Sequence, residues 1–416
     1  MTYTSIELSS ICEIKNGYAF KSDHYTSSGY RVIRITNVQK GKIIDDDPKF
    51  ISSEIADNLP SFKLFQGDIL ISLTGNVGRV GIIGEELLPA LLNQRVGLIR
   101  PISRRIYSPY LFQYLNSQNF EQAAIKNANG VAQLNLSSKW IESHQIPLPP
   151  LDDQIRIATL LSKVENLISR RREQLKQLDE LLKSVFLEMF GDPMSNPKKF
   201  PIKLLSEFYI NSKHGTKCGP FGSALKKNEL LESGIAVWNM DNISSSGRMI
   251  LPFRMWVSEE KFQELQAYSV INGDIIISRA GTVGKMCVAK MDGVPAIIST
   301  NLIRLRLSSL LLPLHIVSLM TFCNGRVGRL KTGADGTFTH MNTGILDTLE
   351  FPYPPIELQR KFADILVKLE RIKIYYQQSL CKMVDLYGVL SQKAFKGDLD
   401  LSRVPLVEKD NQPFLD

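Results

Sequence analysis

The sequence predicts an α+β protein in which two pseudo-two-fold related, mixed α/β globular domains are separated by two long antiparallel coiled-coil helices. Three observations carry this prediction: a repeat that spans most of the chain, a long apolar heptad pattern in each copy, and a proline-rich segment before each pattern. The chain has 416 residues, of which 44% are hydrophobic and 22% charged. Two or three domains with buried cores are therefore expected.

The repeat is clearest in a run of glycine, aspartate and aliphatic residues. Residues 67–72 read Gly-Asp-Ile-Leu-Ile-Ser, and residues 273–278 read Gly-Asp-Ile-Ile-Ile-Ser. A second segment, Pro-Leu-Pro-Pro-Leu at 147–151, returns as Pro-Tyr-Pro-Pro-Ile at 352–356. Both pairs are separated by about 205 residues, and a spacing kept over so much of the chain indicates two tandem copies of one unit.

Each copy begins with a globular part. In the first copy, short runs rich in β-branched residues at 32–35, 69–73 and 96–99 alternate with loops rich in Gly, Asn, Asp and Ser. Such runs predict strands. Later segments, 109–115 and 313–320, follow a proline that suits the first turn of a helix. We therefore expect an α+β globule in each copy.

A long helix follows each globule. Residues 152–190 contain no proline or glycine, whereas the corresponding segment of the second copy contains Gly388. Apolar residues spaced alternately four and three apart predict a coiled-coil seam in each copy. Its predicted members are Ile157, Leu161, Val164, Ile168, Leu175, Leu178, Leu182, Val185 and Met189, then Phe362, Leu366, Leu369, Tyr376, Leu380, Met383, Tyr387, Leu390 and Ala394, with Arg171 and Lys373 as breaks. Two such seams in one chain are expected to pack on each other, antiparallel.

These patterns predict five segments. We expect globular domains at residues 1–150 and 193–354, spacer helices at 151–192 and 355–398, and a tail at 399–416. The glycine, proline and asparagine residues that follow residue 190 supply the turn between the first helix and the second globule.

Composition excludes several classes of protein. The five cysteines lie far apart and form no Cys-x-x-Cys pair, and the five histidines lack metal-ligand spacing, so neither a disulfide framework nor a metal site is expected. The first ten residues lack the pattern of a signal peptide, and the uncharged run at 307–325 contains polar residues and a proline. A cytoplasmic protein without a membrane span is expected.

No catalytic motif is found. Gly-Thr-Val-Gly-Lys at 281–285 is too short for a phosphate-binding loop, and its counterpart in the first copy has Arg79 in place of Lys285. The segment Tyr353-Pro354-Pro355 has the wrong order for the signature of amino-methyltransferases. The formal charge of +8 lies almost entirely in the two globular parts. That distribution permits contact with a polyanion such as DNA, although surface charge that only keeps the protein in solution fits nearly as well.

With these features in view, the chain resembles the specificity subunit of type I restriction–modification systems over about residues 5–398. The resemblance is carried by Gly-Asp-Ile-Leu-Ile-Ser-x-x-Gly-x-x-Gly at 67–78, and by the segments 148–154 and 353–359 that open the helices. Their duplication in the same order makes the resemblance specific.

The resemblance implies a DNA-binding subunit without activity of its own. Each globule would be a target-recognition domain that reads one half of an asymmetric, bipartite sequence of double-stranded DNA. Two adenine methyltransferase subunits would dock on it and bring S-adenosylmethionine, and restriction–translocase subunits would bring ATP and Mg²⁺. No cofactor is expected on this chain itself.

Candidate contact residues follow from side-chain chemistry. Arg and Lys suit guanine edges or phosphates, and Asn suits adenine. The DNA-binding candidates are Lys15, Lys21, Arg34, Asn76, Arg79, Lys217, Lys226, Asn239, Arg279 and Lys285, each with a solvated surface role as the alternative. The candidates for binding partner subunits are Leu151, Gln154, Ile356 and Gln359, with helix capping and packing as the alternative. Arg100 and Arg306 stand at equivalent strand ends, where a structural ion pair is equally expected.

A second hypothesis comes from another class of protein. The seams and the modest charge also fit a coiled-coil scaffold with two protein-binding lobes. DNA affinity that falls steeply with salt would favour the DNA-binding hypothesis, because it reports the release of counterions from phosphates.

Overall fold

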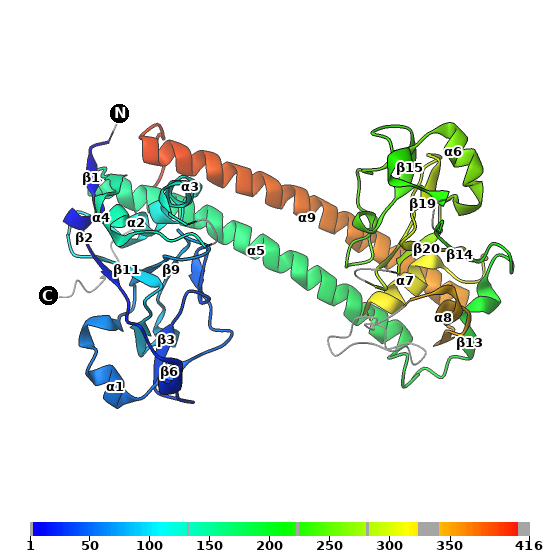
Figure 1. Cartoon of the computed structure of the whole chain (residues 1–416), viewed down its shortest axis with the longest axis horizontal. Coiled ribbons are helices and arrows are strands. Elements are labelled where there is room, and N and C mark those ends of the chain that lie inside the picture. The colour runs from blue at the N-terminus through cyan, green and yellow to red at the C-terminus, as the bar shows by residue number, and fades with distance from the viewer. Residues whose placement is uncertain (1–2, 131–132, 222–223, 280–282, 323–340, 407–416) are drawn as a thin grey trace. The chain divides into compact units, whose positions relative to one another are not determined.

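The computed structural model describes residues 3–130, 133–221, 224–279, 283–322 and 341–406. The chain divides into two compact units, unit 1 made of Met1–Glu173 with Gln377–Asp416, and unit 2 made of Gln174–Tyr376. Each unit combines small sheets, short helices and part of both long helices (Figure 1). The α+β class predicted from the repeat is therefore confirmed.

Unit 1 is built around two four-stranded sheets. The first is antiparallel, and its strands are, in spatial order, β2 (Cys12–Asn16), β11 (Val96–Pro101), β8 (Ile69–Ser72) and β9 (Val80–Ile82). The second contains a parallel pair, and its order is β6 (Phe50–Ile51), β3 (Tyr30–Ile33), β10 (Ala90–Leu92) and β7 (Lys63–Leu64). The two-stranded sheets pair β1 (Ser5–Glu7) with β12 (Gln145–Pro147) and β4 (Val38–Gln39) with β5 (Lys42–Ile43). Its short helices are α1 (Ser53–Asp57), α2 (Ser108–Leu115), α3 (Gln118–Asn127) and α4 (Ser138–Ser143).

Unit 2 repeats this topology. Its antiparallel sheet has the order β14 (Thr216–Cys218), β20 (Leu302–Leu305), β17 (Ile275–Ser278) and β18 (Met286–Val288). Its second sheet has the order β16 (Trp256–Val257), β15 (Ile235–Trp238) and β19 (Ala296–Ile298), again with a parallel pair. Strand β13 (Ile202–Leu204) pairs with β21 (Glu350–Pro352). The short helices are α6 (Glu259–Glu264), α7 (Pro313–Phe322) and α8 (Thr343–Asp347). Equivalent strands thus lie at the spacing that the sequence repeat predicted.

The long helices are α5 (Leu151–Phe190) and α9 (Ile356–Lys396), and each contributes a part to both units. In unit 1, Ile157 and Leu161 of α5 share a core with Ala394 of α9. In unit 2, Phe186 and Phe190 of α5 lie against Phe362. Early residues of one helix meet late residues of the other, so the two helices run antiparallel within each unit, as predicted.

Two details of the seam differ from the heptad prediction. Phe186 and Phe190 are buried at the end of α5, whereas the predicted members Val185 and Met189 are half-buried. Lys373, predicted as a break, is only 2% exposed and forms an ion pair with Asp179 of α5. The seam therefore contains a buried charge with its own partner at the position where the apolar pattern stops.

No helix in the described ranges is long and apolar enough to span a membrane.

Candidate nucleic-acid interface

A buried asparagine shapes the same loop in both units. After β3, the Asn37 side chain accepts a hydrogen bond from the Arg34 N–H at 2.8 Å and donates one to the Ile44 carbonyl at 2.8 Å. After β15, Asn242 accepts from the Asn239 N–H at 2.9 Å and donates to the Ile250 carbonyl at 3.0 Å. These bonds satisfy backbone groups that the strand no longer pairs. The candidates Arg34 and Asn239 consequently stand at equivalent positions in the two units.

The pocket of unit 1 lies beside this loop. It has a volume of about 450 Å³, and Asn76 and Arg79 are among its lining residues, with Gln39, Thr74 and Gln133. Arg79 donates from Nη1 to Oε1 of Gln39 at 2.9 Å. The turn that carries both candidates is held by Ser72, whose hydroxyl donates to the Asn76 carbonyl and accepts from the Arg79 N–H at 3.0 Å.

The pocket of unit 2 brings two other candidates together. It has a volume of about 220 Å³ and is lined by Leu225, Lys226, Lys227, Leu230, Asn239, Met255, Ser299, Thr300 and Asn301. The Ser299 side chain is 9% exposed, and its hydroxyl has no hydrogen-bond partner among the described residues. A buried hydroxyl in that state is available to a ligand that enters the pocket.

The remaining candidates of unit 2 lie around β17 and β14. The guanidinium of Arg279 lies 5.0 Å from the centroid of the Phe221 ring, and Nζ of Lys217 lies 5.1 Å from that of Tyr268. Both distances suit cation–π contacts. Lys285 is half-buried, and its carbonyl accepts the Ser278 N–H at 2.8 Å.

The remaining candidates of unit 1 differ in exposure and in whether they form an ion pair. Lys15 forms an ion pair with Glu13 at 2.5 Å, and Arg34 forms one with Asp47 at 3.1 Å. The pKa of Glu13 is lowered, first because Lys15 donates a hydrogen bond to its carboxylate. Lys21 is exposed and lies next to the short 3₁₀ helix Ser22–His24.

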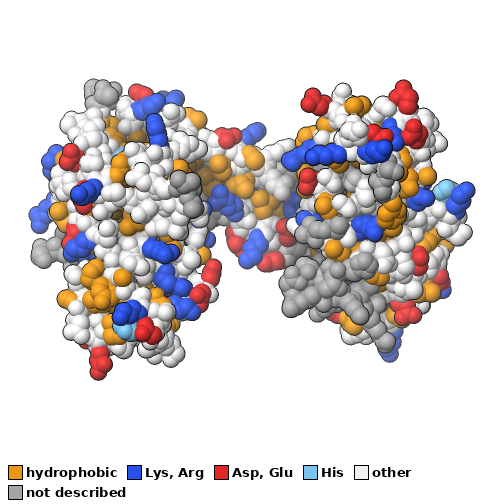
Figure 2. Space-filling model, in the orientation of Figure 1, with side chains coloured by type: hydrophobic (Ala, Val, Ile, Leu, Met, Phe, Trp, Pro, Cys, Tyr) orange, Lys and Arg blue, Asp and Glu red, His pale blue; other side chains and the backbone are white. Residues whose placement is uncertain are grey.

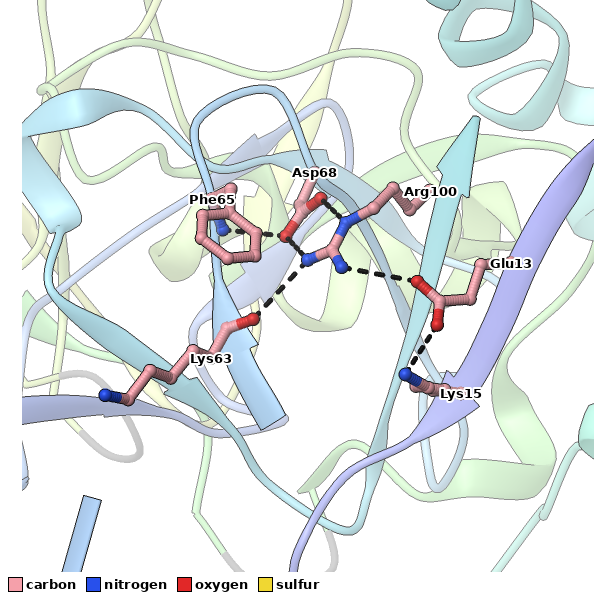
Figure 3. A network of polar contacts seen from close by, with 6 residues as sticks. All are labelled: Glu13, Lys15, Lys63, Phe65, Asp68 and Arg100. Carbon is pink, nitrogen blue, oxygen red and sulfur yellow. Dashed lines mark hydrogen bonds and ion pairs between the residues drawn. The ribbon is translucent and has the colours of Figure 1, made fainter. Parts of the chain in front are cut away.

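Arg100 and Arg306 have the structural role that was one of the two alternatives. Arg100 donates from Nε and Nη2 to both carboxylate oxygens of Asp68, at 2.7 and 2.6 Å, and from Nη1 to Glu13 at 3.3 Å (Figure 3). Arg306 makes the same two-fold contact with Asp274. Asp68 and Asp274 are the aspartates of the repeated Gly-Asp motif, so this motif joins neighbouring strands of the sheet rather than facing a ligand.

The partner-binding candidates Gln154 and Gln359 require a correction, because both side chains are fully buried. Gln154 accepts from the Tyr107 N–H at 2.8 Å and donates to the Pro149 carbonyl at 2.9 Å. Gln359 accepts from the Leu312 N–H and donates to the Pro354 carbonyl, both at 2.9 Å. These amides fasten the start of each long helix to its globule and are not surface groups. Leu151 and Ile356 are half-buried at the helix starts.

Sequence reasoning missed several residues of these sites. Gln39 and Gln133 line the pocket of unit 1, Asn301 lines that of unit 2, and Phe221 covers Arg279. Phe221 carried a usable signal, because an aromatic residue after Gly219 and Pro220 stands in a loop where it has no core to join. The others lie in unremarkable polar segments that only the fold brings to the pockets.

The visible surface of each unit carries charges of both signs. On the face shown in Figure 2, Lys and Arg side chains are interspersed with Asp and Glu side chains on both units. No group of His, Cys, Asp and Glu side chains suited to a metal ion occurs among the described residues.

The sequence matches a known protein family over most of its length. Residues 2–178 and 221–379 match the model of the family described as type I restriction modification DNA specificity domain. The EcoBI specificity subunit of Escherichia coli is 23% identical over 432 residues, which cover 96% of this chain and 86% of that protein. The MjaVIII specificity subunit of Methanocaldococcus jannaschii is 29% identical over 184 residues, 43% of each chain.

Two solved structures share the fold. One is a chain from a structure of a type I R-M system, a study of complex assembly and conformational transition. It gives a TM-score of 0.58 at 18% identity, and the match covers 96% of this chain and 98% of that one. The S subunit of the type I restriction–modification system from M. genitalium gives a TM-score of 0.55 at 17% identity, covering 95% and 96%.

Proposed function

Because this chain belongs to the family of type I restriction–modification DNA specificity proteins, we propose that it directs a type I complex to one asymmetric, bipartite DNA sequence. Residues 1–150 and 193–354 act as its two target-recognition domains, and each reads one half-site. Bound at that sequence, the chain directs adenine methylation or restriction by partner subunits.

One observation carries this proposal: the two units share a scaffold but differ at the sites where a ligand could be read. The Asp–Arg pair, the asparagine-centred loop and the buried glutamine occur in both. On this common scaffold Arg34 stands where unit 2 has Asn239, and Leu73 stands where unit 2 has Arg279. Different side chains on equivalent backbones are what two different half-sites require, because bases are distinguished by donor and acceptor patterns.

The chain supplies recognition in this proposal, and its partners supply the chemistry. Two adenine methyltransferase subunits bring S-adenosylmethionine and extract the target base from the helix, which adenine methylation requires. Restriction–translocase subunits bring ATP and Mg²⁺. The complex works in the cytoplasm, on the DNA of the cell and of invading phage.

The long helices offer a surface for these partners. Large apolar side chains on them are exposed: Leu167 52%, Leu181 46%, Ile374 49% and Tyr375 69%. Exposed large apolar side chains are frequent at protein interfaces. We propose that the methyltransferase subunits cover these side chains, with Leu151 and Ile356 at the border.

Modified-base sequencing of the host genome, with and without the gene, tests the proposed function. Loss of one bipartite methyladenine motif in the deletion strain is the expected result, and it identifies both half-sites at once. A chimaera in which residues 193–354 come from another family member should change one half of that motif and keep the other. An exchange that alters both halves, or neither, contradicts the assignment of one half-site to each domain.

A further inference from the structure

Arg279 stands at a position where the two units carry chemically different side chains. In unit 1 the equivalent residue is Leu73, which is 4% exposed and belongs to the hydrophobic core. The two residues make equivalent backbone hydrogen bonds: the Leu73 N–H donates to the Arg95 carbonyl and the Arg279 N–H to the Asn301 carbonyl, each at 3.0 Å. Unit 2 thus has a half-buried arginine where unit 1 has a core leucine, and its buried Nη1 costs free energy unless it forms a hydrogen bond.

The guanidinium of Arg279 is oriented but incompletely paired. It lies 5.0 Å from the ring centroid of Phe221, a side chain that is 59% exposed. Its Nη1 is buried and has no hydrogen-bond partner among the described residues. The Phe221 ring lies against the planar group, whereas the buried Nη1 still requires an acceptor.

The surroundings point to nucleic acid as the source of that acceptor. Asn301, whose carbonyl receives the Arg279 N–H, also lines the 220 Å³ pocket together with Lys226 and Asn239. Exposed, flexible lysines such as Lys226 suit phosphates. A guanidinium fixed at the end of a strand presents two parallel donors instead, and these match O6 and N7 of guanine in the major groove.

We propose that Arg279 reads a guanine in the half-site recognised by unit 2, and that Phe221 is the residue that positions it. This inference rests on the proposed function and adds a base and a contact to it. The first half-site lacks the corresponding contact, because Leu73 offers no donor.

The test uses the full chain with its methyltransferase partners, and synthetic duplexes that carry 7-deazaguanine at one guanine at a time. That analogue lacks only the N7 acceptor. We expect one guanine of the second half-site to be sensitive in the wild-type complex, with binding weakened about 2- to 12-fold, because one of the two hydrogen bonds of a bidentate pair is lost. Arg279→Ala should bind the natural duplex more weakly and lose the sensitivity at that one position.

Two further variants complete the design. Phe221→Leu should reduce the sensitivity at the same guanine about 2- to 5-fold, because the guanidinium loses its platform. Lys290→Ala, which removes an exposed cation of the same unit, should keep the full wild-type sensitivity. Because Phe221 is exposed, its variant tests the idea even if Arg279→Ala folds poorly.

Three results would overturn the inference while leaving the proposed function intact. These are a second half-site with no sensitive guanine, an Arg279→Ala complex that keeps the sensitivity, and an Arg279→Ala loss that is equal on all sequences, which would indicate a phosphate contact. A wild-type complex that methylates no bipartite sequence would instead overturn the proposed function, and this inference with it.

Discussion

Arg306 donates from Nε and Nη2 to the two carboxylate oxygens of Asp274, at 2.7 and 2.8 Å, and the Asp274 side chain is completely buried. The same arrangement joins Arg100 to Asp68 in unit 1. A buried carboxylate is stable only while its charge is compensated, so the repeated Gly-Asp motif depends on an arginine about 32 residues further along.

Removing that arginine should therefore be severe. We expect Arg306→Leu to lower the free energy of unfolding of unit 2 by about 3–5 kcal/mol, because Asp274 is left charged and buried. The double variant Arg306→Leu with Asp274→Leu should be less destabilised than the single one. Chemical denaturation followed by fluorescence of Trp238, a buried residue of the same unit, measures both. Equal losses in the single and double variants would contradict this account.

Replacing one or the other member of the ion pair in the helix seam should change the free energy of unfolding by different amounts. Lys373 is 2% exposed, whereas the side chain of its partner Asp179 is 55% exposed. Lys373→Met should change the free energy of unfolding by less than about 1 kcal/mol, since it removes a buried charge and leaves a solvated one. Asp179→Ala should cost more, about 1–3 kcal/mol, because Lys373 loses this partner and, among the ion pairs of the described residues, keeps Glu370 at 3.8 Å. Thermal unfolding of the two variants decides the order, and the reverse order would show that the lysine itself stabilises the seam.

The glutamine at the start of α9 should matter through the backbone group that it satisfies. Gln359→Ala leaves the Leu312 N–H without its acceptor, so we expect a loss of about 1–3 kcal/mol in the free energy of unfolding. Gln378→Ala, at an exposed position of the same helix, is the matched control and should change little. If the two variants were equally stable, the proposed anchoring of the helix start would be wrong.

His315 should make unit 2 sensitive to acid. Burial lowers the pKa of His315 to about 3, and its ring packs against Phe186 and Phe190 with no hydrogen-bond partner among the described residues. Its pKa in the unfolded chain is about 6.5. Because the unfolded state binds the proton first, the stability present above pH 6.5 is lost as the pH falls from there towards the folded pKa.

At pH 5 this residue alone should lower the free energy of unfolding by about 2 kcal/mol relative to pH 7. His315→Phe should remove that part of the pH dependence, and denaturant titrations at pH 7, 6 and 5 measure it. His214→Gln, at an exposed histidine of the same unit, should leave the pH dependence unchanged. A His315→Phe variant as acid-sensitive as the wild type would assign the effect to other groups.

The exposed face of the helices should be needed for assembly. We expect Ile374→Ser with Tyr375→Ser to reduce the methyltransferase that copurifies with this chain by at least about tenfold, as for loss of apolar interface residues. The fold should persist, because both side chains are exposed. DNA binding by the isolated chain is the control, and normal copurification would place the partner surface elsewhere.

The amino-acid sequence by itself determined the repeat, the α+β class and the antiparallel pair of long helices. Those features have a local or periodic signature: a heptad pattern persists over dozens of residues, and a tandem copy preserves spacing wherever its side chains point. The predicted seam at Ile157, Leu161 and Phe362 followed from that periodicity alone.

Only the tertiary structure decided what individual polar residues contact. The sequence pattern could not tell whether Gln154 and Gln359 contact a partner or the protein's own backbone. It also could not show that Lys373 forms an ion pair with Asp179, 194 positions away. It likewise could not assemble Lys226, Asn239 and Asn301 around one pocket, or place Phe221 over Arg279. Hydrogen bonds and cation–π contacts depend on distances of a few ångströms between segments far apart in the chain, and no periodicity encodes those distances.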